Sequence, residues 1–150
     1  MPFVNGGGGS GGSQPVTREQ FFGIASNIAD NAQGNLTWDN PQGDALLNLS
    51  TPGLPTVVAA GVYAVSVTVT GNSITVGGYY QANLDMDTAN EDARVTEDSP
   101  TASASHDNPL ISLANTYYVP AGGIISVSVA NLDGSATRAF AMSAVVQRLS

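Results

Sequence analysis

Alternation between large apolar side chains and small ones is the feature that most constrains what this chain can fold into. In "AGVYAVSVTV", residues 60–69, the odd positions carry Tyr63 and a row of valines after Gly61. The even positions carry small or hydroxylated residues, namely Val62, Ala64, Ser66 and Thr68. A period of two in a run rich in β-branched residues predicts a strand. Its even face is neither charged nor strongly apolar. Such a face suits contact with another part of the chain or with another subunit.

Similar runs recur along the chain between turn sequences such as "DNPQGD", "TGNS" and "LDGS". A chain of 150 residues without cysteine is long enough to bury one core with no disulfide. The number and spacing of the runs predict an all-β sandwich. We expect strands near residues 36–38, 45–49, 61–70, 73–87, 110–113, 124–131 and 139–149.

Residues 87–108 are predicted to form one long solvated loop, because connections of this length are uncommon and usually serve an interaction. This segment holds six of the twelve carboxylates of the chain.

Three segments are expected along the chain. Residues 1–14, "MPFVNGGGGSGGSQ", are predicted to be a flexible Gly/Ser-rich arm, either a natural arm or an engineered linker. Residues 15–34 are predicted to form a short helix, because Thr17 and Gln20 have the spacing of a capping box. Apolar residues then recur at helical spacing from Phe21. Residues 35–150 are expected to form the β domain.

Charge excludes two classes of partner. The chain has no lysine and only four arginines against its twelve carboxylates, for a net charge of -8. Binding to nucleic acid or to an anionic membrane relies on clustered basic residues, so neither partner is expected. No apolar run approaches the length of a membrane span, and the first residues do not resemble a signal peptide. We therefore expect a soluble protein without an export signal.

Three stretches resemble the superfamily of tumour necrosis factor and the complement globular heads. "VVAAGVYAVSVTVTGN" (57–72) resembles its central strand, and "YYVPAGGIISVSVANLDG" (117–134) its late strand. "RAFAMSAVVQRLS" (138–150) is similar to its closing strand. The resemblance covers about residues 36–149 and implies a jelly roll that trimerises about a threefold axis. Family members occur in secreted ligands, spore surface proteins and phage virion proteins. The absence here of a collagen-like stalk, a disulfide or a signal peptide counts against a secreted ligand but not against a virion protein, which would be made in the host cytoplasm.

The closing strand predicts the same assembly from its own pattern. Phe140, Met142, Ala144 and Val146 fall on one face, yet Val145 and Leu149 make the other face apolar too. A strand with one wet face should alternate cleanly, so the second face is expected to meet another subunit. The alternative is that the N-terminal helix or a loop covers it. The predicted trimer interface comprises Tyr63, Val145 and Leu149.

Catalytic candidates are few. His106 is the only histidine, and it lies beside Asp107 in the acidic loop, so we interpret it as a solvated imidazole. Asp85 and Asp87 would share one strand face with Tyr79, a pattern that fits a glycosidase pair but is typical of a wet sheet surface. We therefore expect no enzyme and no cofactor.

A carbohydrate site and a calcium site are the alternatives to a surface that binds no ligand. Tyr79 and Trp38, with the amides of Gln81 and Asn83, are the residues from which a carbohydrate site would be built. The spacing of the acids does not fit a helix-loop-helix calcium loop. An irregular calcium site would draw on Asp87, Glu91, Asp92, Glu97 or Asp98. We interpret these acids as a solvated charged loop and expect no metal.

The sequence thus predicts a trimeric jelly roll that decorates or cements a phage capsid. The major capsid protein or another virion protein is the expected partner. The alternatives are a receptor-binding tip that recognises a host-surface glycan and a free carbohydrate-binding module. The predicted capsid-anchoring residues are Phe3, Val4, Phe21, Phe22, Ile24 and Ile28.

Overall fold

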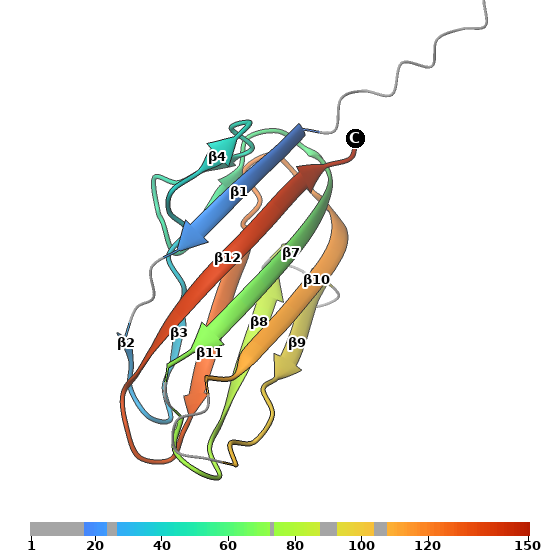
Figure 1. Ribbon diagram of the computed structural model, residues 1–150. Coiled ribbons are helices and arrows are strands. Elements are labelled where there is room, and N and C mark those ends of the chain that lie inside the picture. The colour runs from blue at the N-terminus through green and yellow to red at the C-terminus, as the bar shows by residue number, and fades with distance from the viewer. Residues whose placement is uncertain (1–16, 24–26, 73, 88–92, 104–107) are drawn as a thin grey trace, which may run out of the picture.

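The computed structural model is a sandwich of two antiparallel sheets. It describes residues 17–23, 27–72, 74–87, 93–103 and 108–150. The first sheet has the strand order β10-β7-β12-β1-β4, and β2 pairs with the end of β12 (Figure 1). Its strands are β1 (Thr17–Gly23), β2 (Asn27–Ile28), β4 (Gln42–Gly43), β7 (Gly61–Gly71), β10 (Leu110–Val119) and β12 (Arg138–Arg148).

The second sheet has the order β3-β11-β8-β9, and a small pair, β5 and β6, lies outside both sheets. Its strands, with those of the small pair, are β3 (Gln33–Asn35), β5 (Leu47–Asn48), β6 (Thr56–Val57), β8 (Tyr79–Asp85), β9 (Arg94–Asp98) and β11 (Ser126–Leu132). The chain crosses between the sheets from β7 to β8, from β9 to β10, from β10 to β11 and from β11 to β12. These crossings make the sandwich a jelly roll.

The core lies between the sheets and follows the predicted alternation. Odd residues of β7 and even residues of β12 are buried along both strands. The rings of Tyr80 and Phe140 pack edge-on with centroids 4.6 Å apart. A Cβ at Gly71 would collide with the Tyr80 ring, so glycine is required where β7 passes over this pair. The core thus brings together strands from all parts of the described chain.

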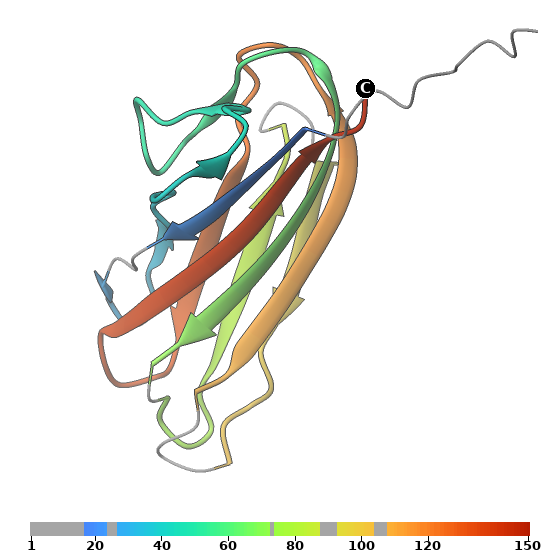
Figure 2. The ribbon, with the colours of Figure 1, turned by 45° about the horizontal axis from the view of Figure 1, so that its top comes forward.

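The predicted helix over residues 15–34 is wrong where the structure describes it. Residues 17–23 form β1, which pairs with β12 from Thr17 opposite Arg148 to Gly23 opposite Met142. Glu19 and Phe21 point into the sandwich, while the even residues of β1 point outward. β1 and the C-terminus lie side by side at one end of the molecule (Figure 2). A two-residue period therefore overrode the helical spacing, because β12 offered β1 a full ladder of hydrogen bonds.

The predicted long loop over residues 87–108 is interrupted by a strand. β9 spans Arg94–Asp98 and pairs with β8 from Gln81 opposite Asp98 to Asp85 opposite Arg94. The acids at 97 and 98 therefore lie on the edge strand of the second sheet. Such an edge strand suits charged side chains, which discourage pairing with other chains. Residues 88–92 and 104–107 lie outside the described ranges.

Candidate functional site

The outer face of the first sheet is the candidate functional surface. Even residues of β7 and β10 and odd residues of β12 point away from the core, as their alternating burial shows. The strand register places Val145 opposite Ser66 and also opposite Gln20, while Ser66 lies opposite Ala114. The next row contains Phe22, Ser143, Thr68 and Ser112. We call these two rows together the central rows.

The central rows form a shallow groove of about 420 Å³ on the sheet. Small side chains lower its floor, and Phe22, which is 48% exposed, lies at one side of it. None of the outward-facing residues on the described parts of β1, β7, β10 and β12 is a carboxylate, and Arg18 is the single charged one. In a chain with twelve carboxylates this face is therefore suited to contact with another protein surface rather than to water.

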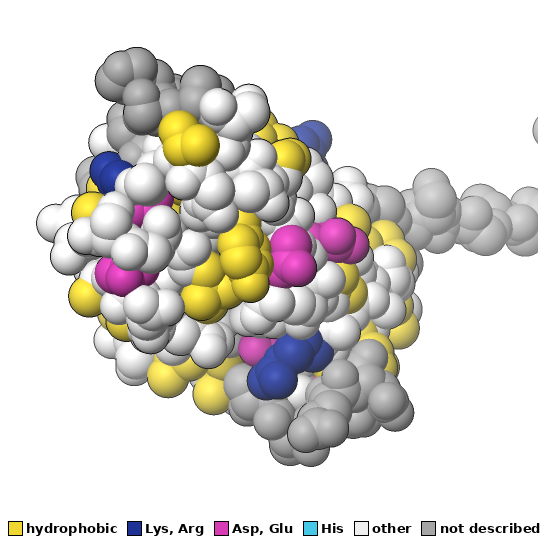
Figure 3. Space-filling model, turned by 90° about the horizontal axis from the view of Figure 1, so that it is seen from below, with side chains coloured by type: hydrophobic (Ala, Val, Ile, Leu, Met, Phe, Trp, Pro, Cys, Tyr) yellow, Lys and Arg dark blue, Asp and Glu magenta, His cyan; other side chains and the backbone are white. Residues whose placement is uncertain are grey.

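The far end of the sandwich has a different character. Viewed from below, acidic, basic and apolar side chains lie side by side over the surface (Figure 3). The lack of negative charge is thus a property of the first sheet's outer face and not of the whole surface.

Two of the three predicted interface residues lie on this face. Val145 is half-buried in the central rows, and Leu149, just beyond β12, is 48% exposed. Tyr63 does not lie there, because it is an odd residue of β7 and its ring is fully buried between the sheets. Its hydroxyl donates a hydrogen bond to the Ala59 carbonyl at 2.6 Å, and burial raises the pKa of Tyr63. Tyr63 is therefore a core residue of the single chain.

Part of this surface does not follow from the strands predicted from the sequence. β10 was predicted to end at residue 113, but it continues to Val119 and places Ala114, Thr116 and Tyr118 on the outer face. The alternation in "LISLANTYYV" carried this signal. Gln20 was not predicted as a surface residue, and Phe22 was predicted on a helical anchor instead, because the outward position of both depends on residues 17–23 forming a strand.

The predicted anchoring residues do not form one helical stripe. Phe21 is fully buried and Ile28 is 4% exposed, so both belong to the core of their own chain. Phe22 alone of the described members is exposed. The remaining members, Phe3, Val4 and Ile24, lie outside the described residues.

The second sheet carries a set of polar side chains on its outer surface, where the sequence places Asp85 on one strand face with Tyr79. Gln33 donates to the Ser128 hydroxyl at 2.9 Å, and Thr96 donates to the Asn83 amide oxygen at 2.5 Å. Gln81 donates to Asp98 at 2.9 Å. Arg94 forms a 2.6 Å ion pair with Asp85. These side chains satisfy one another across the strands, which is how a sheet surface is stabilised.

The carbohydrate site built on Trp38 is not formed. Trp38 is 1% exposed and packs against Phe21 in the core, so its ring cannot stack on a sugar beside Tyr79. Asp85, one half of the weighed glycosidase pair, is held by Arg94.

Among the described residues, no three or more His, Cys, Asp or Glu side chains are grouped so that they could hold a metal ion. Glu91 and Asp92, two of the five acids of the alternative calcium site, lie outside the described ranges, and so does His106. Among the described residues there is also no helix that is long and apolar enough to cross a membrane.

Two buried acids escaped the sequence analysis. Glu19 is 3% exposed and accepts hydrogen bonds from the backbone N–H groups of Leu46 (2.8 Å) and Leu47 (3.0 Å). Burial raises the pKa of Glu19, and the negative charge of nearby Asp44 raises it further. The two backbone N–H groups act in the opposite direction but do not cancel the rise. Glu19 thereby ties β1 to the segment that leads into β5.

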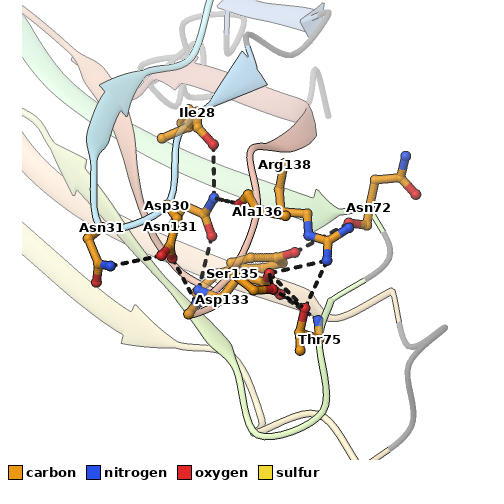
Figure 4. Close-up of polar contacts among 12 residues, drawn as sticks. Ile28, Asp30, Asn31, Asn72, Thr75, Asn131, Asp133, Ser135, Ala136 and Arg138 are labelled. Carbon is orange, nitrogen blue, oxygen red and sulfur yellow. Dashed lines mark hydrogen bonds and ion pairs between the residues drawn. The ribbon is translucent and has the colours of Figure 1, made fainter.

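Asp133 lies at the centre of a polar cluster at the β11–β12 turn (Figure 4). It accepts hydrogen bonds from the Thr75 backbone N–H, from the Thr75 hydroxyl at 2.8 Å and from the Ser135 hydroxyl at 3.1 Å. Arg138 adds a 3.1 Å ion pair. Burial alone would raise the pKa of Asp133, but these donors outweigh burial and lower it. The cluster locks the β11–β12 turn to the β7–β8 connection and needs no ligand.

No family model matches the sequence, and no curated protein matches it significantly. Solved structures do. The chain is similar to PRD1 vertex protein P5, with a TM-score of 0.64 and 18% identity over 90% of this chain and 99% of that one. It is similar to the globular domain of zebrafish complement 1qA, with a TM-score of 0.63 and 11% identity over 90% and 98% of the two chains. For the Eiger TNF of S. frugiperda the TM-score is 0.54, with 16% identity over 91% and 94%.

These likenesses define the class of fold. The molecule is a jelly roll of the kind found in tumour necrosis factor and the complement globular heads, which confirms the resemblance noted from its strands. Its likeness to PRD1 vertex protein P5 extends over nearly the whole of that chain.

Proposed function

We propose that this protein is a non-enzymatic structural protein of a phage particle, in which a homotrimer decorates or cements the capsid. The observation that carries the proposal is the outer face of the first sheet, which has small and apolar side chains and no carboxylate among its described residues. Similarity to PRD1 vertex protein P5 supports a place in a virion. Fold alone does not define a function, so the test must be made on particles.

The trimer forms through the central rows in this proposal. A closed ring buries each protomer's face against a neighbour, and the small residues along these rows allow close approach of two sheets. Val145 lies at the centre of the contact, and Leu149 lies at its rim. The cores of interfaces are depleted of charged residues, and the central rows contain none.

The capsid contact is made by the segment before β1 in this proposal. Phe3 and Val4 are the apolar side chains near its beginning, and three such segments on one trimer act together through effective concentration. The major capsid protein or another virion protein is the partner.

The test uses gradient-purified particles of the phage that encodes the chain. We expect mass spectrometry to find the chain at a fixed ratio to the major capsid protein. Particles made without it should assemble, lose heat stability, and regain that stability when the purified chain is added. Absence of the chain from purified particles overturns the proposal. Normal heat stability combined with lost adsorption to host cells would instead indicate the receptor-binding tip.

A further inference from the structure

An apolar row crosses the end of the first sheet where β1 begins. Val62 lies opposite Tyr118 in the register, and the Leu149 N–H donates to the Val62 carbonyl at 2.8 Å. All three side chains lie on the outer face of the sheet, with Tyr118 57% and Leu149 48% exposed. We call Leu149, Val62 and Tyr118 the end row. It lies outside the central rows and has no charged member.

The chain enters the described structure beside this row. Thr17, the first described residue, pairs with Arg148, the residue just before Leu149. The start of β1 and the C-terminus lie at the same end of the sandwich (Figures 1 and 2). Sixteen residues precede Thr17, and none of them has a charged side chain. Among them, Phe3 and Val4 form an apolar pair followed by a glycine-rich run.

The reach of this segment matches the distance to the row. Thirteen bonds between residues separate Val4 from Thr17, which for a Gly-rich chain gives a root-mean-square span of roughly 20 Å. From β1 to β10 the sheet is three strand spacings wide, or about 14 Å. A linker whose average span is near the required distance gives a high effective concentration of its end group.

From this placement we propose that Phe3 and Val4 dock on the end row of their own chain. The occupant is apolar and uncharged, as the row is, so no charge is desolvated when the two meet. Docking keeps the apolar pair covered in the free protein. The proposed capsid contact would then require the pair to exchange one apolar surface for another.

The absence of cysteine from the chain allows a direct test by disulfide trapping. The trap is the double variant Val4→Cys with Thr116→Cys, because Thr116 is exposed on the outer face two residues from Tyr118 and outside the end row. The comparison is Val4→Cys with Leu110→Cys, because Leu110 is 56% exposed on the same strand and face, lies farther from the end row and is outside the central rows. Both are oxidised as purified chains without particles and read on non-reducing gels and by mass spectrometry.

We expect linked single chains from the Thr116 pair to form about tenfold faster than from the Leu110 pair, because docking holds Val4 near the Tyr118 end of β10. Replacing both Leu149 and Tyr118 with Ser should bring the Thr116 rate down to the Leu110 rate, since reach is unchanged and the apolar contact is removed. Circular dichroism and sedimentation check that each variant keeps its fold and assembly.

Equal rates in the two pairs, or no effect of the Ser substitutions, overturn the docking. Disulfides formed only between chains also overturn it and assign the row to a neighbour's segment. None of these outcomes decides whether the protein binds a particle.

Discussion

The ring of Phe21 packs edge-on against the ring of Trp38, with centroids 5.1 Å apart and ring planes at 80°. Both rings are buried, and they join β1 to the segment that follows β3. β1 is therefore a structural strand of the sandwich, and the seven residues that form it are not free to serve as a detachable anchor.

Phe21→Ala should lower the free energy of unfolding by about 3–5 kcal/mol, because it removes a fully buried ring and leaves a cavity. Val76→Ala is the control, since Val76 is 58% exposed and outside both sheets. It should change stability by less than about 0.5 kcal/mol. Urea unfolding of both variants and the original chain gives the values. A similar small loss in both would contradict the core position of Phe21.

Truncation distinguishes the segment before β1 from β1 itself. A chain that starts at Thr17 should fold, because it keeps every described strand. A chain that starts at Asn35 lacks β1, β2 and the core residues Phe21 and Ile28, so it should fail to fold. Circular dichroism and proteolysis resistance report the difference. A folded product from the shorter chain would show that the sandwich does not need β1.

Assembly should depend on Val145. Val145→Asp puts a carboxylate into the central rows and should dissociate the proposed trimer, since an unpaired buried charge costs several kcal/mol. Val58→Asp is the control, at a position 60% exposed and outside the two sheets. Sedimentation velocity is the measurement. A monomer for the original chain, or an unchanged trimer for Val145→Asp, would contradict the proposed interface.

Asp133→Asn should destabilise the protein by at least about 2 kcal/mol at pH 7, because it leaves the Thr75 and Arg138 donors without their carboxylate. The native pKa of Asp133 is lowered, so its contribution is present above the unfolded pKa and is lost as pH falls through the native one. The difference in the free energy of unfolding between the original chain and Asp133→Asn, measured with urea, should therefore become smaller in acid. Asp98→Asn, at an exposed position on β9, should show neither effect.

Glu19 should have the opposite dependence on pH. Its native pKa is raised above 4.5, so folding binds its proton more tightly and its contribution is greatest below that value. That contribution is lost as pH rises through the native pKa. The stability of the original chain relative to Glu19→Gln should therefore fall between acid and neutral pH, as measured by urea unfolding at each pH. A relative gain over this range would contradict the raised pKa.

The sequence by itself determined the β class and most of the core. The two-residue period in β7 and β12 selects which side chains are buried, because alternate residues of a strand face opposite ways. It also determined the outer face of β7 and, on β12, the outward position of Val145. The same parity argument places Tyr63 in the core, since it is an odd residue of β7 with buried Gly61 on one side and buried Val65 on the other.

Only the tertiary structure decided the state of residues 17–23 and the full extent of the candidate surface. Spacing in this segment fits a helix and a strand equally, and the open edge of β12 selected the strand by pairing with it over seven residues. The roles of Glu19 and Asp133 arise in the same way, from contacts between residues far apart in the chain. Local pattern cannot supply these partners, because they meet only when the two sheets close on each other.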